Sequence, residues 1–168
     1  TSTLIGIAID EGYINSIEDP ITNYLPDWKN QDQDKILLKH LLSMRSGMED
    51  HGFVYVVPDM VSHSLDRDII RPPGAAFRYS NEDSMILGEI IQNATGMSFQ
   101  EYADKKLFNL IGADETWWTD QEGNTISYAS IDMTPREFAK FGLMIAQEGN
   151  WQGQQIVSSD WIELATSK

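Results

Sequence analysis

The stretch 72–81 (PPGAAFRYSN) constrains the fold of this chain most, because it dictates where one element ends and another begins. Its prolines hold φ near one value and disfavour helix just before them, and Gly74 completes a turn. A short extended piece follows and meets a new helix at Tyr79, Ser80 and Asn81. Ser80 or Asn81 can cap that helix, whose first turn is acidic. The stretch presents a phenol, a hydroxyl and a carboxamide together, either as an ordinary polar helix start or as a place for chemistry.

Helical patterns dominate the rest of the chain. Apolar spacing and capping signals predict helices over residues 1–11, 19–25, 35–44, 82–93, 98–107 and 134–148, and a last helix that begins at 158 or 159. The helix at 134 has the strongest start, with an N-cap threonine, a first-turn proline and a capping-box glutamate. Residues 27–34 are expected to form a polar loop and 110–114 a turn, and 116–119 a short strand or an aromatic wall.

Residues 49–71 are the least regular part of the sequence. They contain a β-branched run stopped by Pro58 and one helical turn over 59–65, and they are longer than common connections. We therefore expect an excursion over the surface or around a cleft, with a role in binding. There is no internal repeat and no clean linker, which predicts one domain or a piece of one. The first helix is almost entirely apolar and starts at residue 1, so we expect the chain to be truncated there.

The charge balance excludes several classes of partner. Lysine and arginine number 12 against 26 acidic residues, which gives a formal charge of −14 over 168 residues. Such a chain repels nucleic acid and anionic membranes, so neither is expected as a partner. No apolar run reaches the ~20 residues of a membrane span. There is no cysteine, so disulfides, thiolate catalysis and cysteine metal sites are excluded.

Most candidate chemistry in the sequence is weak. The three histidines are too few and too irregularly spaced for a metal site, and His40 is interpreted as a core or rim residue. Asp50 and His51 lack a serine in a G-x-S-x-G elbow, so a triad is not supported. A glycosidase needs two facing carboxylates, and among so many acidic residues a pair carries little information. No phosphate-binding loop of the G-x-x-x-x-G-K type is present, and no cofactor is expected.

Tyr79 is the remaining candidate. A tyrosine can act as a general base when a nearby cation lowers the pKa of its phenol. The neighbouring Arg78 should point to the opposite face of an extended segment. We therefore expect the cation to be a lysine from elsewhere in the fold.

Several motifs together are similar to those of a known family. They are LLSMRSGM at 41–48, PPG at 72–74 with F-x-YSN at 77–81, MTPREFAKFG at 133–142, W-x-G at 151–153 and Trp161. In this order they resemble the serine β-lactamase-like, penicillin-recognising hydrolases, in the branch with class C β-lactamases, D-aminopeptidases, esterases and 6-aminohexanoate-oligomer hydrolases. The resemblance covers nearly the whole chain.

The resemblance implies a mechanism and site residues. A serine in an S-x-x-K motif attacks an ester or amide and forms an acyl-enzyme that water releases. Tyr79 then matches the tyrosine that helps to move protons, and Asn81 the asparagine that binds substrate, with Ser80 a weaker candidate. Trp118, with Trp117, either lines an acyl pocket or belongs to the core. The family favours a bacterial periplasmic or extracellular location and leaves a cytoplasmic one open.

The departures from the family pattern also matter. The S-x-x-K motif should precede the segment that matches residues 1–6, and the K-T-G or H-x-G strand should follow Lys168; neither is in this sequence. We expect residues 1–168 to be a single partial domain, mostly α as given. It would be the helical region of a β-lactamase/transpeptidase-like α/β (α+β) fold with the central sheet strands largely missing. Alone it should lack hydrolase activity. The alternative is a non-catalytic helical binding domain on the same scaffold.

Overall fold

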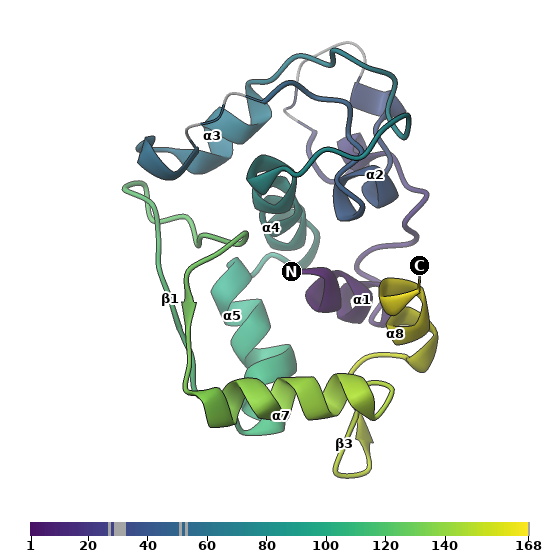
Figure 1. The fold of residues 1–168 in the computed structure, drawn as a ribbon, viewed down its shortest axis with the longest axis vertical. Coiled ribbons are helices and arrows are strands. Elements are labelled where there is room, and N and C mark those ends of the chain that lie inside the picture. The colour runs from purple at the N-terminus through teal and green to yellow at the C-terminus, as the bar shows by residue number, and fades with distance from the viewer. Residues whose placement is uncertain (27, 29–32, 51, 53, 168) are drawn as a thin grey trace.

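Helices carry this fold, and α1 (Ser2–Asp10) and α4 (Asn81–Thr95) lie near its centre (Figure 1). The computed structural model describes residues 1–26, 28, 33–50, 52 and 54–167. In these residues the strands form only two short antiparallel ribbons, which pair β1 with β2 and β3 with β4. The prediction of a mostly helical chain is confirmed. Within the same residues, no helix is both long and apolar enough to span a bilayer.

The central helices follow from local signals in the sequence. Five successive residues of α1, from Leu4 to Ala8, are buried, because the helix is apolar on nearly every side. Ser80 caps α4 by accepting a hydrogen bond from the N–H of Asp83, and Gly96 ends the helix at φ +71°. The predicted helix therefore has the expected start and stop.

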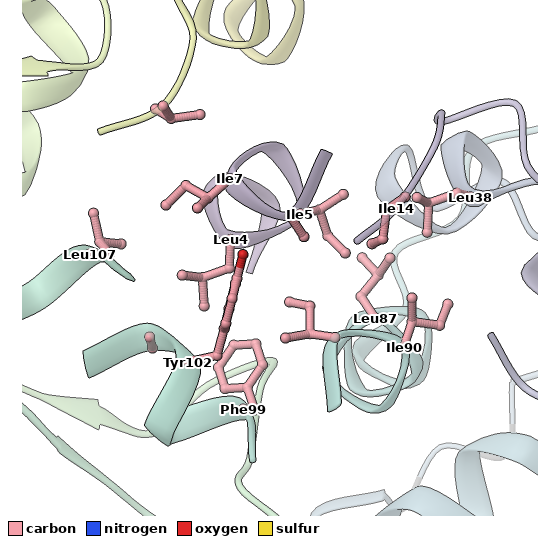
Figure 2. Packing of buried hydrophobic residues seen from close by; sticks show 14 of the residues in the cluster. Leu4, Ile5, Ile7, Ile14, Leu38, Leu87, Ile90, Phe99, Tyr102 and Leu107 are labelled. Carbon is pink, nitrogen blue, oxygen red and sulfur yellow. The ribbon is translucent and has the colours of Figure 1, made fainter. Parts of the chain in front are cut away.

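The main core lies where α1 meets α4 and α5 (Phe99–Ala103). Figure 2 shows Leu4 and Ile5 of α1 among Leu87 of α4 and Phe99 and Tyr102 of α5. All five side chains are almost fully buried. Burial of such side chains supplies about 1.5–3 kcal/mol each, so this junction fixes α4 relative to α1 and α5.

The helix that begins after Ser98 is longer than the sequence indicates. It continues from α5 through a π-helical segment, η4 (Asp104–Phe108), into α6 (Asn109–Ile111), and ends at Gly112 with φ +65°. The turn predicted at 110–114 is therefore wrong in its first two residues. Phe108 and Ile111 are both buried, and the wider π turn extends the helix until both face the core.

The segment predicted as a helix over 19–25 forms only a single 3₁₀ turn, η1 (Ile21–Asn23). The N–H of Ile21 donates to the carbonyl of Ile36 at 3.0 Å, and Pro20 pairs with Leu37. These long-range bonds replace those of a longer helix. The other short elements are η2 (Gln33–Lys35), α2 (Leu38–Leu42), η3 (Val54–Val56) and α3 (Met60–Leu65). Most of the polar loop 27–34, and His51, lie outside the described residues.

The C-terminal half forms a border around the core (Figure 1). It consists of β1 (Thr116–Trp117), β2 (Ile131–Asp132), α7 (Pro135–Ala146), β3 (Asn150–Trp151), β4 (Gln154–Gln155) and α8 (Ser159–Thr166). The capping box of Thr134 and Glu137 starts α7 as predicted, and Ser158 caps α8. Met144 is the buried residue of α7, whereas Phe138 stays exposed and stacks on Phe141.

Candidate active site

The stretch 72–81 is held in place by its own backbone. The N–H of Gly74 donates to the carbonyl of Arg45 at 2.8 Å, and the N–H of Arg78 donates to the carbonyl of Met44 at 2.9 Å. Gly74 has φ +83°, a conformation that a glycine adopts without steric cost. Both acceptors belong to the LLSMRSGM motif, so this motif is the support on which the loop rests.

Gly47 is the tightest point of this support. Its carbonyl accepts hydrogen bonds from the N–H groups of Ile70 at 3.0 Å and Arg71 at 3.1 Å. It has φ +79°, and a Cβ there would lie 2.3 Å from the carbonyl oxygen of Arg71. A side chain at this position would therefore clash with the backbone of Arg71, just before Pro72.

The three polar candidates emerge from this loop with different exposures. The Tyr79 side chain is 66% exposed, whereas Ser80 is only 9% exposed. Ser80 has extended backbone (φ −146°, ψ 115°) and is the N-cap of α4, and Asn81 is the first residue of that helix. The phenol therefore faces solvent, while the hydroxyl next to it points inward and is occupied by the helix cap. Arg78 pairs with Asp50 at 2.8 Å.

A buried ion pair lies beneath Ser80. The guanidinium of Arg67 contacts the carboxylate of Asp83 at 3.0 Å, and both side chains are about 1% exposed. The other nitrogens of Arg67 donate to the carbonyl of Ser64 at 2.9 Å, the carbonyl of Glu49 at 3.2 Å and the hydroxyl of Ser80 at 3.4 Å. The fork of one arginine thus joins three separate segments of the chain.

The carboxylate of Asp83 has further partners. The hydroxyl of Ser46 donates to Asp83 Oδ1 at 2.9 Å. The backbone N–H of Asp83 donates to Ser80 Oγ at 3.0 Å. Burial raises the pKa of Asp83, and Arg67 opposes that rise. Protonating Asp83 would leave the guanidinium buried without a counter-charge, which favours the ionised pair.

The sequence does not single out Arg67 or the role of Ser46. Arg67 stands between Asp66 and Asp68 in the irregular stretch 49–71, where an exposed arginine is the default. Ser46 reads as the end of a helix, yet it is almost fully buried. An acidic residue in the first turn after a YSN sequence gives no indication that it is paired with a partner 16 residues earlier.

The two neighbouring tryptophans have separate surroundings. Trp117 packs edge-on against Phe99 with ring centroids 5.2 Å apart, and so belongs to the core region. Trp118 is 60% exposed, and its indole Nε1 donates to Asp132 at 2.9 Å. Among the described residues, no hydrogen bond or ring contact joins Trp118 to Tyr79, so the structure does not bring these two candidates into contact.

His40 has a structural role. Its Nδ1 accepts a hydrogen bond from the N–H of Leu37 at 3.1 Å, which closes the first turn of α2, and its Nε2 faces Gly74. Burial first, and then Lys39, lowers the pKa of this half-buried imidazole. The interpretation of His40 as a core or rim residue agrees with this environment. In the described part of the chain, no cluster of histidines and carboxylates could hold a metal.

The start of α1 is tied to the start of α4 through Ser127. Thr1 Oγ1 donates to the carbonyl of Ser127, and Ser127 Oγ donates to the carbonyl of Ser84 at 2.9 Å. Ser84 lies in the first turn of α4, three residues after Asn81. The first residue of this sequence is therefore joined through Ser127 to the first turn of α4, at whose start the candidate site lies.

The chain is similar in sequence to known proteins over nearly its whole length. The family model described as Beta-lactamase matches residues 1–165. The chain is 26% identical over 184 residues to the 6-aminohexanoate-dimer hydrolase of Paenarthrobacter ureafaciens, covering 96% of this chain and 46% of that protein. It is 29% identical over 126 residues to the β-lactamase of Escherichia coli K12, covering 70% of this chain and 32% of that protein.

The fold has close counterparts among solved structures. A penicillin-binding protein homologue from Caulobacter crescentus superposes with a TM-score of 0.80 at 15% identity, covering 99% of this chain and 58% of that one. At this identity the match shows the fold alone. The chain spans about half or less of the length of the two curated relatives above. With the family model matching nearly every residue, as the resemblance of the motifs predicted, this chain belongs to the β-lactamase family of hydrolases and penicillin-binding proteins.

Proposed function

We propose that these residues form one wall of the active site of a serine hydrolase that cleaves an ester or amide through an acyl-enzyme. Tyr79 would help to move protons to and from the nucleophile, and Asn81 would bind the substrate. Ser80 would position Tyr79 and Asn81, because its hydroxyl caps α4 and contacts the ion pair beneath it. Trp118 is kept as a candidate for an acyl pocket.

The hydrogen-bonded link from Thr1 to α4 is the observation that carries this proposal. The resemblance places a Ser-x-x-Lys pair just ahead of the segment that matches residues 1–6. Thr1 is joined through Ser127 to Ser84, one turn along α4 from Asn81. A serine and a lysine close before Thr1 would then enter the region of Tyr79, and the lysine could supply the cation that a phenolate needs.

Three of the described lysines have partners other than Tyr79. Lys39 pairs with Glu18, Lys106 pairs with Glu11, and Lys140 binds the carbonyl of Gly112. The 168 residues contain no Ser-x-x-Lys sequence. We therefore expect this chain alone not to form an acyl-enzyme with a reactive ester, and detection of that adduct would contradict the expectation.

The decisive experiment is active-site labelling of the full-length protein that carries these residues. A fluorophosphonate or penicillin probe should modify one serine, which mass spectrometry should locate ahead of Thr1 and three residues before a lysine. Absence of labelling would favour the non-catalytic binding domain.

Tyr79→Phe tests the role of the phenol in the same protein. Removing the hydroxyl should lower turnover of an ester substrate by about 10²–10⁴-fold, the range expected for a general base. Because Tyr79 is exposed, the thermal unfolding midpoint should change little, and this separates chemistry from folding. Turnover close to that of the parent would remove Tyr79 from the mechanism.

A further inference from the structure

We propose that the buried pair of Arg67 and Asp83 is the positioning device of the active-site wall, and that it sets the rate of the chemistry carried out at Tyr79. The inference rests on the proposed role of Tyr79 and extends it to two buried residues. Neither is exposed enough to meet a substrate, so both would act through the backbone between Tyr79 and Asn81.

The pair connects the loop after α2 to the start of α4, next to the wall. Arg67 binds the carbonyl of Glu49 at 3.2 Å, and Asp83 accepts from Ser46 at 2.9 Å, which ties α4 to the loop after α2. The same loop supports the stretch 72–81 through Met44 and Arg45, and holds Ile70 and Arg71 just before it through Gly47. The ion pair and the backbone support therefore hold the wall from two sides.

Ser80 is the point at which the pair reaches the wall. Its hydroxyl accepts from Arg67 at 3.4 Å and from the N–H of Asp83 at 3.0 Å, and it donates to Glu82 at 3.2 Å. Ser80 lies directly between Tyr79 and Asn81 in the chain. Fixing its side chain and its extended backbone fixes the orientation of Tyr79, which has no helix of its own, whereas Asn81 is also held as the first residue of α4.

The orientation of the exposed Tyr79 side chain is not fixed by packing against neighbouring residues. With 66% of its surface exposed, the ring has little packing to fix its orientation. A shift of the phenol by 1 Å can cost about 10²-fold in rate. Any movement of Ser80 away from the pair would leave buried charges with fewer partners, which is costly in a dry interior. The pair thus gives an exposed side chain a rigid base.

Stability alone does not account for this pair. Well-packed apolar side chains commonly stabilise a core as well as a buried ion pair does. Apolar packing imposes no fixed orientation on its partners, whereas the planar guanidinium forms its hydrogen bonds in only one geometry. A pair that joins three segments under the proposed site fits a role in geometry.

A kinetic double-mutant cycle in the full-length protein tests this role. Asp83→Asn should lower kcat for p-nitrophenyl acetate by about 10- to 100-fold with little change in KM, because only the orientation of the phenol is lost. In the Tyr79→Phe background the same substitution should change kcat by less than about twofold, since the group that it positions is already gone. Arg67→Lys, which keeps the charge but not the fork, should behave as Asp83→Asn does.

Two further variants keep the outcome clear. Asp120→Asn removes another buried carboxylate that caps main-chain N–H groups, so it should lower thermal stability and leave kcat unchanged. Ser46→Ala removes one bond to Asp83 and gives a milder form of the same cycle if Asp83→Asn does not fold.

Each result has one meaning. An equal loss of kcat in both backgrounds would show that the pair only stabilises the fold, and would overturn the proposal. If Tyr79→Phe itself leaves kcat unchanged, the proposed role of Tyr79 fails, and the positioning role fails with it. Loss of the effect of Asp83→Asn in the Tyr79→Phe background supports both.

Discussion

At the scale of single residues, Gly47 leaves less room for a side chain than Gly74, the other glycine that supports the loop. Gly47→Ala would combine a left-handed backbone with a Cβ 2.3 Å from the carbonyl oxygen of Arg71. The matched control is Gly12→Ala, because Gly12 has nearly the same φ of +78° and no atom within 4 Å of the added Cβ. Chemical denaturation should show that Gly47→Ala lowers the free energy of unfolding by about 1–3 kcal/mol more than Gly12→Ala. Equal losses would mean that the loop adjusts freely.

His40 should make stability depend on pH. Its folded pKa is lowered, so the folded state binds a proton less readily than the unfolded chain, whose histidine titrates near about 6.5. The stability that neutral His40 provides is therefore complete above that pH and is lost as the pH falls below it. His40→Asn offers a non-titrating acceptor to the N–H of Leu37. Urea unfolding between about pH 5 and 7.5 should show a shallower decline for this variant, and parallel curves would contradict the assignment.

At this scale, a hydrogen bond or ion pair can be predicted from the sequence only when the two residues that form it lie close together in the chain. The cap of Ser80 on the N–H of Asp83 spans three residues, and a serine before an acidic first turn indicates it. The pair of Arg67 with Asp83 spans 16 residues and its bond to Glu49 spans 18, so only the folded chain reveals them. The sequence thus predicted the candidates Tyr79, Ser80 and Asn81 and did not indicate the buried pair of Arg67 and Asp83 beneath them.

At the scale of elements, α4 approaches the segment around Ser127 closely because it carries Gly88. A Cβ at Gly88 would lie 2.4 Å from the hydroxyl oxygen of Ser127, the residue that joins Thr1 to α4. Gly142 lies within α7 with open space around it. Gly88→Ala should lower the free energy of unfolding by about 1–3 kcal/mol, whereas Gly142→Ala should raise it by about 0.5–1 kcal/mol. Thermal unfolding measures both, and changes of the same sign would contradict the packing described here.

The elements themselves were predictable where their signals are local. The capping box before α7 and the left-handed glycine after α4 act within one turn, and both boundaries were found. The helix expected at 19–25 is a 3₁₀ turn because Ile21 bonds to Ile36 across the chain. The continuation of α5 into a π turn depends on how Phe108 meets the core, which no local pattern contains.

At the scale of the whole molecule, the charge of −14 opposes compaction. Raising NaCl from about 20 to 300 mM should screen this repulsion and raise the thermal unfolding midpoint by about 2–4 °C, equivalent to about 1 kcal/mol. A variant with Glu122→Gln and Glu163→Gln, both at exposed positions, should respond less to salt. A midpoint that falls with salt would mean that favourable ion pairs outweigh the repulsion.

The support of the active-site loop has a consequence for how such proteins diversify. Hydrogen bonds from the main chain at Gly74 and Arg78 fasten the loop to Arg45 and Met44, while the side chains of Ala75, Ala76 and Phe77 are exposed. Mutation can therefore alter the rim beside Tyr79 without loosening the loop. Under the proposed function, lineages built on this plan could vary the surface at 75–77 and so explore new substrates, while the backbone that presents Tyr79 stays the same.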